Sequence, residues 1–115
     1  MEKNVIFIRH DMEKKKVTRP GRVYRLMYKS HIMEGLIAEF EPQHQSRWFK
    51  HNGEEMHLVL HGEMEYSVGE HSYRMSAGDI LWHKSTLKHK SKNIGDEKLI
   101  YITVRLPPRA TPSIL

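Results

Sequence analysis

Short segments in which apolar and polar residues alternate follow one another along this chain, and most of them end at a glycine or a proline. Met64, Tyr66 and Val68, for example, alternate with polar residues between two Gly-Glu pairs. No long stretch has the 3.6-residue period of an amphipathic helix. Because side chains two residues apart share one face of a strand, the pattern predicts an all-β fold, a sandwich or barrel of antiparallel strands.

The expected strands are short and are separated by turns at regular spacing. They cover residues 3–8, 22–28, 35–40, 46–50, 55–61, 63–68, 73–75, 80–83, 87–93 and 99–104. Residues 9–21 are highly charged and end in Arg-Pro-Gly, which predicts a loop. Pro107 and Pro108 end the last strand, so we expect residues 107–115 to form a loose tail. A chain of 115 residues without internal repeats predicts one domain.

The composition excludes several classes of protein. Without cysteine the chain has no disulfide framework and no thiolate ligand, which fits the cytoplasm, where we expect this protein. No apolar run is long enough for a signal peptide or a membrane span. The 19 lysines and arginines exceed the 14 acids, which favours anionic partners. Helix-turn-helix, zinc-finger and aromatic RNA-binding patterns are missing, so we do not expect this chain alone to bind nucleic acid.

Nine histidines is a high number for this length, and most of them lie between residues 44 and 89. Neither end carries a histidine tract, so a purification tag does not explain them. His51, Glu55 and His89 supply two imidazoles and a carboxylate at the spacings that a metal site on strands requires. These three residues are the predicted metal ligands.

Residues 51–93 resemble the cupin superfamily, whose two motifs are written G-x5-H-x-H-x3-4-E-x6-G and G-x5-P-x-G-x2-H-x3-N. The chain matches each motif at three positions, which are His51, Glu55 and Gly62, and then Gly78, His89 and Asn93. Because several spacings match at once, the resemblance is far more specific than a lone histidine pair. It implies a double-stranded β-helix, the jelly-roll barrel, with residues 1–115 as a single cupin domain and a core at about 35–106.

The chain also departs from the cupin motifs. Phe49 stands where the first motif has its first histidine, and Gln43 replaces the opening glycine. Lys84 and Thr86 replace the proline and glycine of the second motif. Only Phe49 changes a ligand position, so the usual four-ligand metal site is reduced to three. Residues 35–104 are most similar to the cupin half of helix-turn-helix–cupin regulators, whose DNA-binding half has no counterpart in this sequence.

The resemblance implies that His51, Glu55 and His89 point into the barrel as the facial triad typical of non-haem Fe(II) oxygenases. The implied cofactor is a divalent metal ion, with Fe2+ expected and Mn2+, Ni2+ or Zn2+ as alternatives. The expected function is a small metalloenzyme of the oxygenase, lyase or isomerase type that acts on a small anionic substrate. The alternative is a metal-free cupin that binds and senses a small molecule, as the cupin domains of regulators do.

Three further residues are catalytic candidates because they lie on inward faces of neighbouring strands. His57 follows Glu55 by two residues, so it either replaces the missing ligand or is a hydrogen-bonded core histidine. His83 is a proton donor, a substrate contact or a satisfied interior histidine. Tyr66 brings a hydroxyl into the pocket, where a substrate can be its partner, or belongs to the core.

Arg47, Phe49 and Tyr73 are the candidate substrate-binding residues. Arg47 shares a face with Phe49, and it either holds a carboxylate or phosphonate bidentately or faces solvent. Phe49 is expected to narrow the pocket. Four lysines between residues 84 and 92 surround His89, and they either attract anions or keep an edge strand soluble.

The resemblance also implies assembly, since small cupins commonly pair their sheets or exchange N-terminal strands. We therefore expect a homodimer in which residues 5–8 are the candidate exchanged strand. The expected partners are a second copy of this chain and a small anionic molecule.

Overall fold

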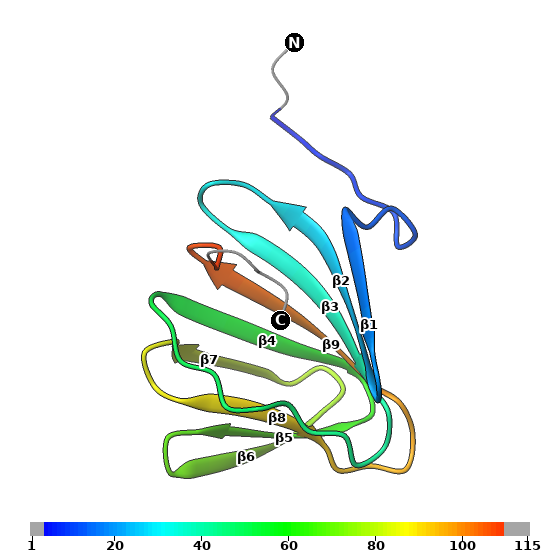
Figure 1. Ribbon diagram of the computed structural model, residues 1–115, viewed down its shortest axis with the longest axis vertical. Helices are drawn as coiled ribbons and strands as arrows, with labels where there is room; N and C mark the ends of the chain where they lie inside the picture. The colour runs from blue at the N-terminus through cyan, green and yellow to red at the C-terminus, as the bar shows by residue number, and fades with distance from the viewer. Residues whose placement is uncertain (1–3, 110–115) are drawn as a thin grey trace.

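The computed structural model describes residues 4–109, and every regular element in this range is a β-strand (Figure 1). A six-stranded sheet has the order β1 (Lys15–Arg19), β2 (Arg22–Lys29), β3 (Glu34–Phe40), β9 (Leu99–Leu106), β4 (Glu54–His61) and β7 (Ile80–Lys84). A three-stranded sheet has the order β6 (His71–Ser76), β5 (Glu63–Val68) and β8 (His89–Asn93). All neighbouring strands are antiparallel, which confirms the all-β prediction.

The hydrophobic core follows the alternation of the strands. In β3, Leu36, Ala38 and Phe40 are buried, while the residues between them are only partly buried. Met64 and Tyr66 of the three-stranded sheet belong to the same core cluster. Each large apolar side chain removed from water contributes about 1.5–3 kcal/mol, so the two sheets are held together chiefly by this cluster.

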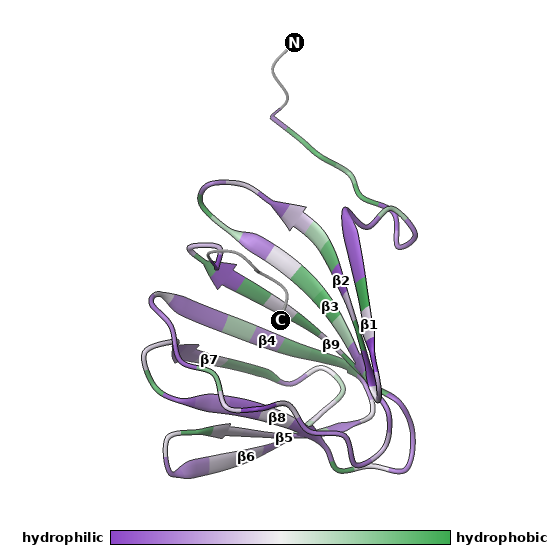
Figure 2. Ribbon diagram, viewed as in Figure 1, coloured by the Kyte–Doolittle hydropathy of each residue, from purple (hydrophilic) through white to green (hydrophobic). Residues whose placement is uncertain are grey.

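One end of the barrel is polar. Figure 2 shows hydrophilic residues where β3 and β4 begin and where β9 ends. The strand register pairs Arg105 of β9 with Glu34 of β3 on one side and with Glu55 of β4 on the other. Charged side chains from three neighbouring strands therefore meet at this end.

The segment between β3 and β4 closes over β8 at this polar end. Phe49 N donates to His89 O at 2.8 Å, and His89 N donates back to Phe49 O at 2.9 Å. His51 N donates to Ser85 O at 3.0 Å. The strand predicted at 46–50 is wrong, because this segment meets β8 only through isolated bridges and does not continue as a ladder.

Two predictions for the N-terminal part are also wrong. A strand was predicted at residues 3–8, but residues 4–8 form none, because this exposed apolar run has no partner strand in the described chain. Residue 3 lies outside the described residues. Residues 15–19, predicted to be a loop, form β1 and pair with β2 across a tight turn. Gly21 has φ +80° in this turn, and a Cβ there would lie 2.5 Å from His44 Nδ1, so the position requires glycine.

Residues 107–109 pack back against the polar end. Arg109 N donates to Glu34 Oε1 at 3.1 Å, and its guanidinium lies 5.2 Å from the ring centroid of Phe49. Arg109 is therefore held against the barrel, unlike the loose tail that we expected, and residues 110–115 of that tail lie outside the described part. Within the described part, no helix is long and apolar enough to cross a membrane.

Candidate metal centre

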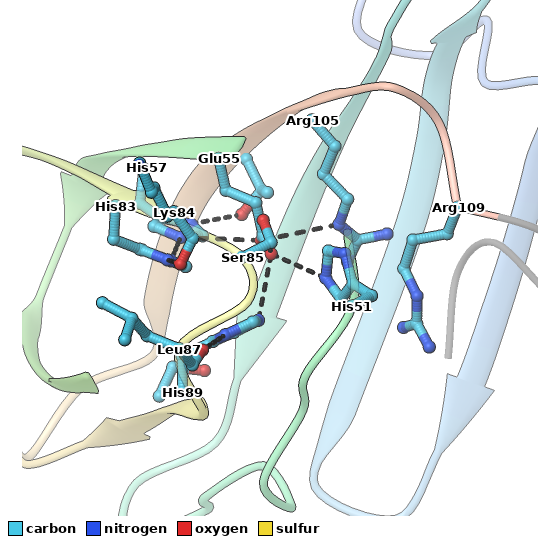
Figure 3. Close-up of polar contacts among 12 residues, drawn as sticks. His51, Glu55, His57, His83, Lys84, Ser85, Leu87, His89, Arg105 and Arg109 are labelled. Carbon is cyan, nitrogen blue, oxygen red and sulfur yellow. Dashed lines mark hydrogen bonds and ion pairs between the residues drawn. The ribbon is translucent and has the colours of Figure 1, made fainter. Parts of the chain in front are cut away.

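Glu55 is the centre of the polar end. It is 2% exposed, and three polar atoms lie around its carboxylate oxygen Oε2 (Figure 3). His51 Nε2 lies 2.7 Å from this oxygen and His89 Nε2 lies 2.9 Å from it. Ser85 Oγ donates to it at 3.0 Å. A buried carboxylate needs such partners, because an unpaired buried charge is strongly destabilising.

The other carboxylate oxygen, Oε1, faces Arg105 and His57. Arg105 Nε lies 3.6 Å from Glu55 Oε1, and Arg105 Nη1 donates to Glu34 Oε1 at 3.0 Å. His57 Nε2 lies 3.7 Å from Glu55 Oε1. Both acids are almost inaccessible to water, and the guanidinium of Arg105 between them offsets their repulsion.

Strand geometry explains why these side chains converge. Glu55 and His57 are two residues apart on β4, so they share its inward face. The register places Glu55 between His83 of β7 and Arg105 of β9, and it pairs His57 with Thr103 of β9. The other two predicted ligands arrive from β8 and from the loop that closes over it.

Main-chain carbonyls orient both predicted histidine ligands. His51 Nδ1 lies 3.1 Å from Asn52 O, and His89 Nδ1 lies 2.7 Å from Leu87 O. A carbonyl can only accept, so Nδ1 carries the proton in both rings and Nε2 is directed at Glu55. His51 Nε2 is buried, and its close polar neighbour is the Glu55 carboxylate at 2.7 Å.

These observations fit a divalent metal ion. The ligand atoms of His51, Glu55 and His89 all lie within 4.8 Å of one another. An imidazole that donates from Nδ1 and offers its other nitrogen is the usual form of a histidine ligand. The buried Nε2 of His51, beside the Glu55 carboxylate and opposite a donating Nδ1, is therefore placed as a ligand atom would be.

A second group of possible ligands shares Glu55 and adds His57 and His83. His57 Nδ1 lies 2.8 Å from Thr103 Oγ1, and its Nε2 lies 3.0 Å from His83 Nε2. The Tyr66 hydroxyl lies 3.2 Å from the same His83 atom. Because His83 Nδ1 donates to a main-chain carbonyl at 3.0 Å, His83 Nε2 is an acceptor to which either neighbour can donate.

Burial and close partners together set the charge of each group in the cluster. Burial alone would raise the pKa of Glu55, but the close ring nitrogens of His51 and His89 hold this pKa far below its usual range. Burial lowers the pKa of His57 to about 3, and it also lowers the pKa of His83. At neutral pH an anionic carboxylate therefore lies beside a neutral histidine pair.

Phe49 and Arg47 lie at the open side of the cluster. The Phe49 ring stacks on the His89 ring with centroids 6.3 Å apart, and the Arg47 guanidinium lies 5.2 Å from the Phe49 centroid. Phe49 lines a cavity of about 30 Å³ that reaches Glu55 and Tyr66. This inner cavity has room for one small group or a water molecule.

Tyr73 is not part of this cluster. It is 44% exposed on β6, the outer strand of the three-stranded sheet. Its cross-strand partner Tyr66 lies one strand closer to the cluster and is buried. Tyr73 instead lines a surface hollow with Trp82 and Leu87, which His83 of the cluster also borders. The other predicted site residues lie in the cluster or beside it.

Sequence reasoning missed Ser85, Thr103 and Arg105. Thr103 and Arg105 sit two residues apart in β9 among β-branched residues, so alternation placed both on one face. A polar pair on the inward face of a hydrophobic strand was the signal that could have identified them. Ser85 follows β7 and gave no such signal, because its place depends on how the chain turns after that strand.

Residues 36–105, more than half of the chain, match the cupin domain family. The chain therefore belongs to the cupin family, and the predicted jelly-roll fold is confirmed. In sequence it is 36% identical over 64 residues to an "Uncharacterized protein" of Archaeoglobus fulgidus. The matched region spans 56% of this chain and only 60% of that curated relative.

Solved structures of cupins share this architecture. KdgF from a Halomonas species has a TM-score of 0.80 at 16% identity, over 90% of this chain and 96% of that one. A predicted oxalate decarboxylase from Thermotoga maritima has a TM-score of 0.76 at 18% identity, over 89% of this chain and 99% of that one. An HTH_3 family transcriptional regulator from Vibrio cholerae has a TM-score of 0.69 at 18% identity, over 77% of this chain and 52% of that one. At such identities the likeness establishes the fold alone.

Proposed function

We propose that this protein is a small metal-binding cupin that holds one divalent metal ion on His51, Glu55 and His89 and acts on a small anionic substrate. The convergence of their three ligand atoms within 4.8 Å carries this proposal. Two imidazoles and one carboxylate suit Fe2+ best, with Mn2+, Ni2+ or Zn2+ as alternatives. When bound, such an ion supplies Lewis acidity, which polarises a substrate oxygen in oxygenase, lyase or isomerase chemistry.

Beside this site, Tyr66, His83 and His57 form a row that can hold and move a proton. The Tyr66 hydroxyl and His57 Nε2 both approach His83 Nε2, at 3.2 and 3.0 Å. Burial raises the pKa of Tyr66 well above its usual value and lowers the pKa of both histidines. In the proposed reaction Tyr66 therefore presents its hydroxyl proton, and the neutral His83 Nε2 accepts one.

Phe49 and Arg47 bind and shield the substrate in this proposal. The Phe49 ring, stacked on His89, limits access of water to the inner cavity. The Arg47 guanidinium lies 5.2 Å from the centroid of this ring and places a positive charge beside it. A small anion is therefore the ligand that these two side chains favour.

Elemental analysis of untagged protein, purified without chelator or added metal, tests the metal site. We expect a near-stoichiometric divalent metal that is lost in His51→Ala and in His89→Ala. His61→Ala is a matched control, because this imidazole lies on β4 but is exposed and pairs with Glu97 at 3.2 Å. Metal retained equally by His51→Ala and His61→Ala, or a parent protein that refuses added metal, would refute the assignment.

A metal-free binding module is the second candidate. Without any ion, the carboxylate of Glu55 already has close partners on both oxygens, among them Ser85 and Arg105. The likeness to a regulator of Vibrio cholerae also favours a sensor of a small molecule. Chelator-treated protein that binds a small carboxylate or phosphonate as tightly as metal-loaded protein would favour this candidate.

We also propose that two copies of this chain pair in the cytoplasm through the outer face of the six-stranded sheet. The register sets Met56 of β4 against Trp82 of β7, and Leu58 against Ile80, and three of these four side chains are exposed. An apolar sheet face that is not covered within the chain can pack on an identical face. Residues 5–8 extend away from the barrel as an exchanged strand would (Figure 1).

A further inference from the structure

A second and larger cavity of about 350 Å³ adjoins the inner cavity. Three arginines, Arg19, Arg22 and Arg47, line it, and we call it the arginine cavity. Tyr24, Ser46 and Phe49 line both cavities, so the two share a wall. A ligand in the arginine cavity would therefore lie next to the Glu55 cluster.

The hairpin of β1 and β2 brings two of these arginines to the cavity, Arg19 as an exposed residue and Arg22 as a half-buried one. Arg19 shares a strand face with the buried Val17, and Arg22 shares one with the buried Tyr24. Arg19 and Arg22 are direct cross-strand partners. Like charges in this relation destabilise a hairpin, so the pair has a cost that a bound anion would offset.

Within residues 4–109, none of the three arginines makes an ion pair. Arg19 Nη1 and Arg22 Nη1 donate to nearby main-chain carbonyls, at 3.0 and 3.3 Å, and Arg22 also interacts with the Tyr24 hydroxyl in the cavity wall. Arg47 lies over the ring of Phe49, and none of the residues that line the cavity is acidic. Arg105 at the inner cavity differs, because Glu34 and Glu55 already balance its charge.

We propose that the arginine cavity binds the phosphate or phosphonate group of a small organic ligand whose other end reaches the Glu55 cluster. Three guanidinium forks around one cavity match the charge and the several acceptor oxygens of a tetrahedral dianion. Ser46, on the shared wall, lies where a ligand would pass from one cavity to the other. The position of the ligand's second end rests on the proposed function, whereas anion binding in the arginine cavity does not.

The test is a titration of the chelator-treated full chain with inorganic phosphate and with methylphosphonate, followed by NMR of the main-chain amides. We expect saturable binding in the millimolar range, with the largest shifts at Ser46 and Phe49. Arg19→Gln and Arg47→Gln should each weaken this binding by about tenfold, because each removes a charge-assisted hydrogen bond.

Lys16→Gln is the matched control, because it removes one charge from the same strand but from the opposite face. Equal affinity in Arg19→Gln and Lys16→Gln, or no saturable binding by the parent, would overturn the proposal. Malonate bound more tightly than phosphate would overturn the assignment of a tetrahedral group.

His51→Ala separates this proposal from the metal site. The variant should lose metal while it keeps its affinity for phosphate, because His51 does not line the arginine cavity. Phosphate binding by a parent chain that takes up no metal would refute the proposed metal site and still support the arginine cavity. Metal binding without any phosphate binding would refute the arginine cavity as an anion site and still support the proposed metal site.

Discussion

His57 and His83 face each other inside the barrel with their Nε2 atoms 3.0 Å apart. One proton has to lie between the two nitrogens, or a metal ion has to replace it, because two lone pairs at this distance repel. Burial excludes the doubly charged pair, since it lowers the pKa of both rings. The pair is therefore a stabilising contact as well as a candidate proton store.

Replacing His83 by leucine should destabilise the metal-free protein by about 1–3 kcal/mol, because His57 Nε2 and the Tyr66 hydroxyl both lose their partner. Urea denaturation at neutral pH measures the free energy of unfolding. His61→Leu, at an exposed imidazole of β4, should change it by less than about 0.5 kcal/mol. Equal losses in the two variants would contradict the role of the buried pair.

Arg105→Leu should cost about 3–5 kcal/mol, because it leaves the fully buried Glu34 without its guanidinium partner. The ion pair of the exposed Lys98 with Glu39 gives the comparison, and Lys98→Leu should cost less than about 1 kcal/mol, because Glu39 keeps Arg25 as a partner. The double variant Glu34→Gln with Arg105→Leu should recover part of the loss. If it is no more stable than Arg105→Leu alone, the buried pair does not explain the effect.

Phe49→His should raise the affinity for a divalent metal ion by at least about tenfold, because an added imidazole supplies one more ligand beside His89. Calorimetric titration of the chelator-treated protein with Zn2+ measures this affinity. Phe49→Leu controls for loss of the aromatic ring and should not raise it. An unchanged affinity in Phe49→His would place the metal away from this side of the cluster.

His44 should titrate below its ordinary pKa of 6.5, because burial and the charge of Arg22 lower it. The unfolded chain then binds more protons than the fold, so the stability due to neutral His44 is complete above pH 6.5 and is lost as the pH falls below it. NMR titration of the His44 ring gives its midpoint. His44→Gln should flatten the fall in stability below pH 6.5, and a midpoint above 6.5 would contradict the prediction.

Trp82→Glu combined with Met56→Glu should convert a homodimer into a monomer, since it places charges on both strands of the proposed contact face. Light scattering after gel filtration measures the molar mass. Tyr73→Glu, also at an exposed aromatic residue but on β6, should leave the dimer intact. A parent chain that is already monomeric would refute the proposed dimer.

Alternation of side chains was enough to locate the strands from β2 to β9, and motif spacing was enough to choose His51, Glu55 and His89. Both patterns involve residues at short, fixed separations along the chain, so they can be identified from the sequence without knowledge of the fold. Residues 4–8 and 15–19 were assigned wrongly because a strand also needs a partner. An apolar run without a partner stayed extended, whereas a charged run paired with β2.

The sequence by itself therefore determined the all-β class and the inward faces, because periodicity alone controls which side chains share a face. The predicted ligands came from the resemblance to the cupin motifs. Only the tertiary structure decided the environment of Glu55. Sheet register brought Arg105 to it, and the turn after β7 brought Ser85. The tertiary structure also placed Arg19 and Arg22 at one cavity with Arg47, although Arg22 and Arg47 are far apart in sequence. Such contacts depend on how strands pair across long loops, which side-chain patterning within a single strand does not encode.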